Sequence, residues 1–327
     1  MREIERELGE VRIRPYAAGD TAELLQLWAL SMPQDAINEA VFLKKVLLDP
    51  NFDARGCLVA EVADRLVGFI LAIVNKVPLD IEPVDRETGH ITVFFVHPDH
   101  RRQGIGSALV QEAVAFIRSE GASQVRVCGY PRNYFFPGPD VNLHAGAIAL
   151  LKKLGFETLY TAIAMHGFLG DFDRLSEAAL QELERSVLDE HGVRVQFITP
   201  DYVKDMLLMI RAHFNPDWVR EARHLLEMYG PDCRQLLVAV TDDHQVVGYC
   251  QWGGHEPGRF GPYGVRPDMR GKGLGKLLFH KCLNLMHKER VHSIWLMWTG
   301  PESVAAEVYR MGGMREYRRW AVMHQRL

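Results

Sequence analysis

The stretch Val96-His-Pro-Asp-His-Arg-Arg-Gln-Gly-Ile-Gly-Ser107 recurs in the second half of the chain as Val265-Arg-Pro-Asp-Met-Arg-Gly-Lys-Gly-Leu-Gly-Lys276. The valine, the proline, the aspartate, one arginine and both glycines hold the same places in the two copies. Such self-similarity within one chain is the signature of a repeated structural unit. The sequence therefore predicts two copies of one fold.

The similarity extends to both sides of these stretches. The matching segments are an early strand, a hairpin, an amphipathic helix directly after the repeated stretch, and an alternating strand after that helix. They lie at 11–15 and 193–197, at 57–70 and 236–249, at 105–117 and 274–286, and at 125–127 and 294–296. Each copy thus contains the parts of a sheet with helices packed on it.

These matches predict an N-terminal domain at 1–170, a linker helix at 171–192 and a C-terminal domain at 193–327. The linker ends where a charged stretch of helical pattern reaches Gly192, a typical helix stop. We expect two tandem domains of the α/β (α+β) class. Each should be a mixed, mainly antiparallel sheet flanked by helices.

Composition narrows the class of protein. The 327 residues are 47% hydrophobic and 24% charged, as in a soluble globular chain, and the formal net charge of −4 argues against a nucleic-acid partner. The five cysteines are scattered without a C-x-x-C pair, which argues against a disulfide framework or a metal site. Without a leader in the first ten residues or a membrane-spanning run, we expect a cytoplasmic protein.

The repeated stretch lies between a predicted strand and a predicted helix. Its glycines let backbone N–H groups approach a ligand closely, and the start of the helix adds a partial positive charge. Such a turn suits an anion of the size of a pyrophosphate, to which Arg101 or Arg270 can add a charge-assisted contact. Neither copy has the signature of a P-loop or of a dinucleotide-binding fold.

The pattern strand–Val-x-Pro-x-x-Arg-x-x-Gly-x-Gly–helix resembles the acetyl-CoA signature of the GCN5-related N-acetyltransferases, in two tandem copies that cover essentially the whole chain. In that family the turn amides hold the CoA pyrophosphate, and pantetheine lies where the preceding strand splays from its neighbour. The resemblance implies acetyl-CoA as cofactor. It would be held by Val96, Arg101, Arg102, Gln103, Gly104, Ile105, Gly106 and Ser107, and by Val265, Arg270, Gly271, Lys272, Gly273, Leu274, Gly275 and Lys276.

The resemblance also implies direct attack of an amine on the thioester, with a tyrosine of the last helix protonating the leaving thiolate. Tyr309 holds that position in the C-terminal copy, whereas the N-terminal copy has Leu151, and both copies lack the family's asparagine. A phenol can donate a proton and leucine cannot. We therefore expect catalysis in the C-terminal domain, with the N-terminal domain binding CoA or shaping the site.

Three further residues are candidates for roles at the site. Glu256, just before the central strand of the C-terminal copy, is a candidate general base. Tyr263 follows a proline that removes a strand donor, so a bulge could aim this tyrosine at the acceptor. An insertion within 130–140 of the N-terminal copy is rich in aromatics and proline. It forms a substrate wall or lid with Tyr134 as an alternative phenol, or it docks onto the other domain.

The sequence thus predicts transfer of acetyl from acetyl-CoA to a primary amine, on a small molecule or a peptide. Three alternatives stay open. The chain could be a CoA-sensing or interaction module without turnover, or a transferase for longer acyl chains, which the apolar insertion can accommodate. It could also act as the mycothiol synthases do, because those tandem members of the family are similar in length. The sequence is compatible with a homodimer, and it leaves the class of amine acceptor open.

Overall fold

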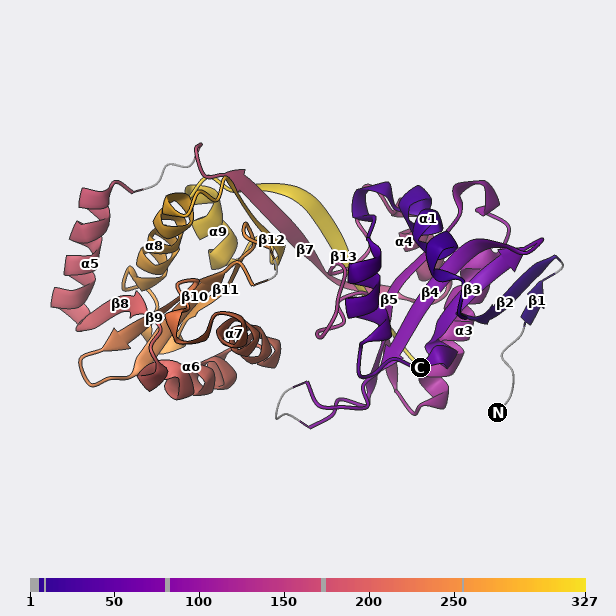
Figure 1. Ribbon diagram of the computed structural model, residues 1–327, viewed down its shortest axis with the longest axis horizontal. Coiled ribbons are helices and arrows are strands. Elements are labelled where there is room, and N and C mark those ends of the chain that lie inside the picture. Colours follow the sequence, from indigo (N-terminus) through magenta and orange to yellow (C-terminus); the bar gives the residue numbers. More distant parts are fainter. Residues whose placement is uncertain (1–5, 9, 80–82, 172–174, 255) are drawn as a thin grey trace. The chain divides into compact units, whose positions relative to one another are not determined.

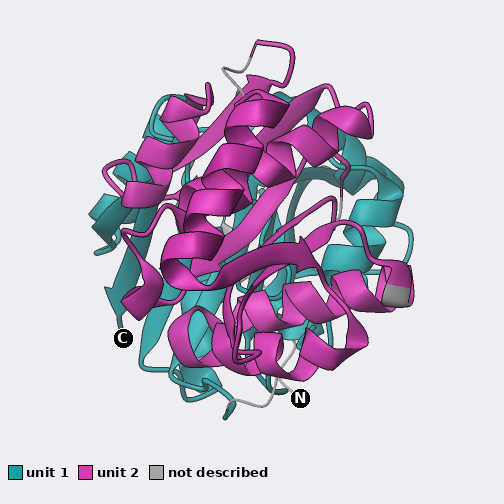
Figure 2. Cartoon of the chain, turned by 90° about the vertical axis from the view of Figure 1, so that its left-hand side faces the viewer, with its two compact units in different colours: residues 1–162, 319–327 teal, residues 163–318 magenta. Residues whose placement is uncertain are grey.

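The computed structural model of the chain describes residues 6–8, 10–79, 83–171, 175–254 and 256–327 (Figure 1). Residues 1–5 and 9, on which part of the expectation about a leader rests, lie outside these ranges. The chain forms two compact units, residues 1–162 with 319–327 (unit 1) and residues 163–318 (unit 2), coloured separately in Figure 2. The predicted domains are continuous stretches, whereas unit 1 contains the C-terminal segment as well.

Unit 1 is built on a mixed sheet in the strand order β1-β2-β3-β4-β5-β6-β13. Its neighbouring strands are antiparallel, apart from the parallel pair β5 and β6. The strands are β1 (Arg6–Leu8), β2 (Val11–Pro15), β3 (Cys57–Val62), β4 (Arg65–Val74), β5 (Thr88–Val96), β6 (Gln124–Val127) and the end of β13 (Arg315–Arg326). This sheet has the mixed, mainly antiparallel character predicted from the sequence.

Helices cover both faces of the unit 1 sheet. They are α1 (Thr21–Ser31), α2 (Glu39–Phe42), η2 (Leu43–Leu47), α3 (Ile105–Ser119) and α4 (Ala145–Lys153), with short turns η1 (Pro33–Asp35), η3 (Ala54–Gly56) and η4 (Pro98–His100). Trp28 of α1 packs on Phe69, with ring centroids 5.9 Å apart. A Cβ on the preceding Gly68 would lie 3.0 Å from Leu109 of α3. Because neighbours along a strand point to opposite faces, α1 and α3 lie on opposite sides of the sheet.

Unit 2 repeats this plan around an antiparallel sheet in the order β11-β10-β9-β8. Its strands are β8 (Val193–Phe197), β9 (Leu236–Thr241), β10 (Val246–Trp252), β11 (Phe260–Val265), β12 (Ser293–Thr299) and the end of β7 (Glu157–Phe168). Its helices are α5 (Glu177–His191), α6 (Pro200–His213), α7 (Pro216–Tyr229), α8 (Leu274–Lys288) and α9 (Val304–Met311), with short turns η5 (Gly230–Asp232) and η6 (Pro267–Met269). Leu278 of α8 approaches Gly248 as Leu109 approaches Gly68.

The two copies of the repeat exchange their last strands. β7 follows α4 of the N-terminal copy, yet its end belongs to unit 2 and pairs with β12, with Phe168 opposite Ser293. β13 follows α9 of the C-terminal copy, yet its end belongs to unit 1 and pairs with β6, with Met323 opposite Val127. Each unit is therefore completed by a strand from the other copy.

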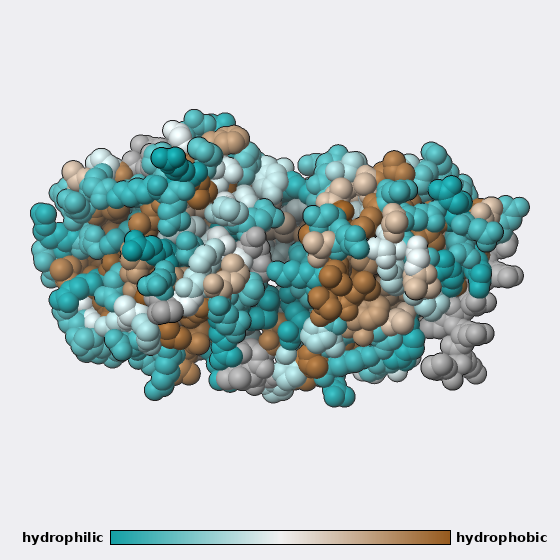
Figure 3. All heavy atoms as spheres, viewed as in Figure 1, coloured by the Kyte–Doolittle hydropathy of each residue, from teal (hydrophilic) through white to brown (hydrophobic). Residues whose placement is uncertain are grey.

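The surface is mostly polar, with groups of hydrophobic side chains between the polar ones (Figure 3). The most exposed large apolar side chains of unit 1 include Leu30 and Leu48, at 61% and 68% exposure. Within the ranges that the structure describes, no helix is both long and apolar enough to cross a membrane. The same ranges contain no group of three or more His, Cys, Asp or Glu side chains placed to hold a metal ion.

Candidate functional site

The repeated stretch of unit 1 forms the turn between β5 and α3. Arg102 has a φ of +65°, and Gly104, at the N-cap of α3, has a φ of +88°. A Cβ on Gly104 would meet nothing within 4 Å, so the backbone conformation alone favours glycine there. This turn exposes the N–H groups at the start of a 15-residue helix, the arrangement that holds phosphate groups in proteins.

Arg101 fixes the turn to its surroundings. Its Nε donates to the carbonyl oxygen of Val96 at 3.1 Å, and its Nη2 donates to that of Ser31 at 3.1 Å. Gln103 Nε2 donates to the carbonyl oxygen of Asp99 at 3.2 Å within the same turn. A guanidinium has five N–H donors, so these bonds leave the charge of Arg101 available to an anion.

A cavity of about 830 Å³ lies beside this turn in unit 1. It is enclosed by the end of α1, the last residues of β5, the turn, the end of β6, the insertion and α4. Of the residues predicted from the sequence, it is lined by Val96, Arg101, Arg102, Gly104, Gly106 and Ser107. Gln103 and Ile105 are outside the lining, and Ile105 is buried, which fits a structural role under α3.

The cavity opens where β5 parts from its parallel neighbour. β5 and β6 pair as far as Ile91 and Val127; β6 ends there, while β5 continues to Val96. The pairing of β5 with β4 on its other side shifts register beside Thr92. Because such a bulge bends a strand, it accounts for the parting of β5 from β6. β5 therefore continues past the end of β6, at the place where the resemblance puts pantetheine.

The last helix of the N-terminal copy, α4, forms another wall of the cavity. Leu150 lines the cavity, whereas Leu151, which stands where the family has its tyrosine, is fully buried. His144 at the N-cap of α4 also lines the cavity, and its Nδ1 accepts the backbone N–H of Asp140 at 3.1 Å. The helix thus presents an imidazole and aliphatic side chains to the cavity.

The insertion within 130–140 contributes Phe136 and Pro139 to the cavity wall. Tyr134, the alternative phenol, is outside the lining, and its carbonyl oxygen accepts from Lys45 Nζ at 2.7 Å. The later part of the insertion docks on β13, where Asp140 forms a bridge with Trp320. By sequence Trp320 belongs to the C-terminal copy, and in the structure it lies in unit 1 with the insertion.

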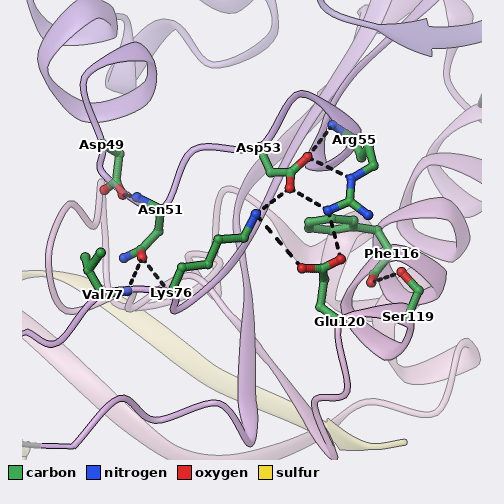
Figure 4. A network of polar contacts seen from close by, with 9 residues as sticks. All are labelled: Asp49, Asn51, Asp53, Arg55, Lys76, Val77, Phe116, Ser119 and Glu120. Atoms are coloured by element: carbon green, nitrogen blue, oxygen red, sulfur yellow. Dashed lines mark hydrogen bonds and ion pairs between the residues drawn. The ribbon is translucent and has the colours of Figure 1, made fainter. Parts of the chain in front are cut away.

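A polar network holds the segment before β3, which lies next to the insertion (Figure 4). Asn51 Oδ1 accepts the backbone N–H of Lys76 at 2.7 Å. Arg55 pairs with Asp53 at 2.7 Å and with Glu120 at 2.8 Å, and the Lys76 ammonium also bonds to Asp53. The Arg55 hydrogen bond holds the pKa of Asp53 well below its usual range. The network ties this segment to β4 and to the end of α3.

In unit 2 the equivalent turn lies between β11 and α8. Gly271 and Gly273 have φ values of +78° and +74°, and Arg270 Nε donates to the carbonyl oxygen of Val265 at 3.2 Å. The two turns thus share their backbone conformation and their arginine contact. Their surroundings differ, because a Cβ on Gly273 would lie 3.5 Å from Leu183 of α5.

Tyr309 and Tyr263 lie in one aromatic cluster of unit 2. The Tyr309 ring centroid is 5.7 Å from that of Phe260, 5.9 Å from that of Tyr263 and 5.6 Å from that of Phe279. Burial raises the pKa of both phenols above the ordinary value. A Cβ on Gly275 would lie 3.5 Å from the Tyr263 hydroxyl, so this side chain reaches the first turn of α8.

Glu256 is exposed, and β11, the strand that follows it, is irregular. Glu256 is exposed in the turn between β10 and β11, where its carbonyl oxygen accepts the Arg259 N–H at 2.9 Å. The register of β10 against β11 shifts opposite Gly261 and Pro262, which are joined by a cis peptide bond. The irregularity expected in this strand is therefore present.

Sequence reasoning missed several residues that line the cavity. The end of α1 and the turn after it, residues 30–34, carry no pattern that distinguishes them from an ordinary helix end. Cys128 lines the cavity with a φ of +60°, uncommon for a residue other than glycine, and nothing in the sequence indicates this conformation. His144 lies seven residues before Leu151, where the family's last helix has the asparagine that both copies lack, and this difference is the signal that the sequence offers.

Comparison with known families decides what kind of protein this is. The model of the acetyltransferase (GNAT) family matches residues 22–156 and 203–313, once in each copy of the repeat and over more than half of the chain. The chain belongs to the GNAT family. This GNAT protein is an acyltransferase, and members of the family use acetyl-CoA as cosubstrate. The family and the tandem arrangement predicted from the sequence are confirmed.

Individual relatives agree with this assignment. The mycothiol acetyltransferase of Saccharomonospora viridis is 24% identical over 241 residues, which are 68% of this chain and 70% of the relative. A GCN5-related N-acetyltransferase from Sphaerobacter thermophilus covers 98% of this GNAT chain and 96% of its own, with a TM-score of 0.71 and 18% identity. A tandem GNAT protein from the clavulanic acid biosynthesis pathway covers 97% of this chain and 98% of its own, with a TM-score of 0.64 and 19% identity. Both structures share the fold.

Proposed function

We propose that this protein transfers an acetyl group from acetyl-CoA to a primary amine, with the cofactor held in the cavity of unit 1. The observation that carries the proposal is a cavity of about 830 Å³ between a left-handed glycine turn and two parting strands. Free N–H groups at a helix start suit a pyrophosphate, and a mostly apolar cleft suits the long neutral arm that follows it. When bound, acetyl-CoA supplies an acetyl group activated as a thioester.

The residues around the cavity would act by binding and orientation. The turn from Gly104 to Ser107 offers backbone N–H groups, and Arg101 and Arg102 offer positive charge to phosphates. Phe136 forms part of the wall where β6 stops. Holding an amine and an acyl group in reacting geometry is a major source of rate acceleration in such a transfer. The amine must first lose a proton, because an alkyl ammonium has a pKa of about 10.4.

Two observations favour unit 1 over the sequence-based expectation of catalysis in the C-terminal domain. In unit 1 the glycine turn is open above Gly104 and adjoins the cavity. In unit 2 the equivalent Gly273 has the linker helix beside it, and Tyr263 and Tyr309 pack against each other. Acetyl transfer in unit 2, with Tyr309 as proton donor and Glu256 as base, is the alternative that the experiment must separate.

The similarity to a mycothiol acetyltransferase supports a small-molecule amine as the acceptor. Formation of mycothiol is accordingly the second candidate function. Its specific support is the match to that relative, which covers 68% of this chain and 70% of the relative.

Calorimetric titration of the intact chain with acetyl-CoA tests the proposal, with Gly104→Val and Gly273→Val as a matched pair. Both glycines have positive φ values, which a β-branched residue tolerates poorly. We expect one bound cofactor in the wild type and in Gly273→Val, and none in Gly104→Val. Loss in Gly273→Val alone would assign the cofactor to unit 2. No binding by the wild type would refute the acetyl-CoA assignment.

Release of the CoA thiol in the presence of a panel of primary amines tests turnover. We expect amine-dependent release, and we expect Tyr309→Phe to keep it, because that phenol is packed in unit 2 rather than in the cavity. A large loss in Tyr309→Phe would move catalysis to unit 2. Binding without any amine-dependent release would favour a CoA-sensing module.

A further inference from the structure

Phe136 lines the cavity and also packs on the C-terminal segment of the chain. Its ring stacks on that of Trp320, with centroids 5.8 Å apart and planes inclined by 10°. Trp320 is only 1% exposed, so its indole fills the space behind Phe136. The N–H of Gly129, just after β6, donates to the Phe136 carbonyl oxygen at 3.1 Å. This stacked pair therefore lies beside the end of β6, where the cavity opens.

Backbone contacts fix the insertion to the same segment. The Ala321 N–H donates to the carbonyl oxygen of Pro139 at 2.9 Å, and the Val141 N–H donates to that of Arg319 at 2.9 Å. A Cβ on Gly138 would lie 2.2 Å from the Ala321 carbonyl oxygen, so only glycine fits between the insertion and the strand. These strand residues are part of the C-terminal segment that Figure 2 colours with unit 1.

We infer that Trp320 is a positioning residue for the acyl-transfer site, because it holds Phe136 and so sets the shape of the cavity beside the end of β6. This inference rests on the proposed function of the cavity. By sequence Trp320 belongs to the C-terminal copy, so the cavity of the N-terminal copy is incomplete without the last strand of the other copy. The C-terminal copy then contributes to acyl transfer without binding a cofactor itself.

The inference has a direct kinetic test. Trp320→Ala removes the stacking partner and leaves space into which Phe136 can turn. We expect the KM for acetyl-CoA to rise about 2- to 12-fold, the range for loss of one aromatic pair. We also expect the ratio of kcat/KM for hexanoyl-CoA to that for acetyl-CoA to rise, because the widened cavity admits a longer chain. Trp320→Phe keeps a ring on Phe136 and should restore most of both values.

Arg326→Ala is the matched control. This residue is exposed on the same strand, and its backbone pairs with Gln124 whatever the side chain, so both values should stay at the wild-type level. If Trp320→Ala does not fold, Trp320→Leu takes its place, because leucine fills much of the space but has no ring to stack on Phe136. The expected changes in KM and in the chain-length ratio are the same.

The outcomes separate this inference from the proposed function. A folded Trp320→Ala protein with unchanged KM and unchanged chain-length ratio overturns the inference, even if kcat or thermal stability falls, because those changes alone indicate a structural role. A wild type that does not bind acetyl-CoA overturns the proposed function instead. A raised KM and ratio in Trp320→Ala, restored in Trp320→Phe, supports both.

Discussion

His90 is a buried titratable group that links the stability of unit 1 to pH. It lies on β5, 3% exposed, with its ring centroid 5.4 Å from that of Tyr130. Burial lowers its pKa from the ordinary 6.5 to about 4. The folded protein keeps this imidazole neutral at pH values where the unfolded chain binds a proton. The stabilisation is therefore complete above about pH 6.5 and is lost as the pH falls toward about 4.

The size of the effect follows from these two pKa values. Between about pH 7.5 and pH 5.0, the unfolding free energy changes only below the unfolded-state pKa of 6.5. That leaves roughly 1.5 pH units, and each unit lowers the unfolding free energy by about 1.36 kcal/mol. His90 should therefore cost unit 1 about 2 kcal/mol of its unfolding free energy over that interval. In His90→Leu this part of the pH dependence should vanish. Urea unfolding at both pH values, read by hydrogen exchange of the β5 and β6 amides, reports on unit 1 by itself.

The matched control is Thr92→Val on the same strand. Thr92 is buried and its hydroxyl donates to the carbonyl oxygen of Leu71 at 3.3 Å, so this change should lower stability equally at both pH values. The carboxyls of Asp20 and Asp53, whose pKa values are lowered, titrate in a more acidic range and do not interfere. An equal loss in the wild type and in His90→Leu would refute the reasoning.

Three other changes test the contacts around the site. Tyr130→Phe removes a buried hydroxyl that donates to Asp49 at 3.0 Å. In urea titrations this change should lower the unfolding free energy of unit 1 by about 1–3 kcal/mol. An unchanged unfolding free energy would mean that water replaces the hydroxyl. Arg101→Lys keeps the charge but loses the bond to the Val96 carbonyl oxygen, so the KM for acetyl-CoA should rise about tenfold, and an unchanged KM would show that charge alone suffices. Glu256→Gln, in an exposed turn, should leave acetyl transfer within about twofold of the wild type, and a hundredfold loss would restore the residue as a general base.

The two glycine turns could be predicted because their determinants are local. A left-handed conformation at the N-cap of a helix favours glycine, so Gly104 and Gly273 mark the turn in the sequence itself. The flanking strand and helix follow from hydrophobic spacing, which records which side chains are buried. Repetition of the same pattern then identified two copies of one fold.

The exchange of last strands could not be predicted in the same way. Residues 157–168 and 315–326 each follow a helix and each read as a strand, but an alternating pattern does not specify which sheet accepts it. The choice depends on contacts between residues far apart in the chain, such as Met323 with Val127. The predicted domain boundary therefore follows the repeat and not the contacts.

The surroundings of the candidate phenols were equally hidden. Tyr309 matches the family's position by spacing, yet spacing does not report that Phe260, Tyr263 and Phe279 pack around its ring. Tyr134 was singled out because it lies in an aromatic insertion, and the same composition serves Phe136 in the cavity wall instead. In both cases the sequence indicates an aromatic side chain near the site, but it does not indicate in which direction that side chain points.

The exchanged strands also constrain how the protein is made. Residues 319–327 are translated after the rest of unit 1, and until they pair with β6 that strand is an open edge of the sheet in unit 1. An unpaired edge is a place where chains associate with one another, so the nascent protein carries this hazard until residues 319–327 have been made. The half that is translated first is therefore the half that is finished last.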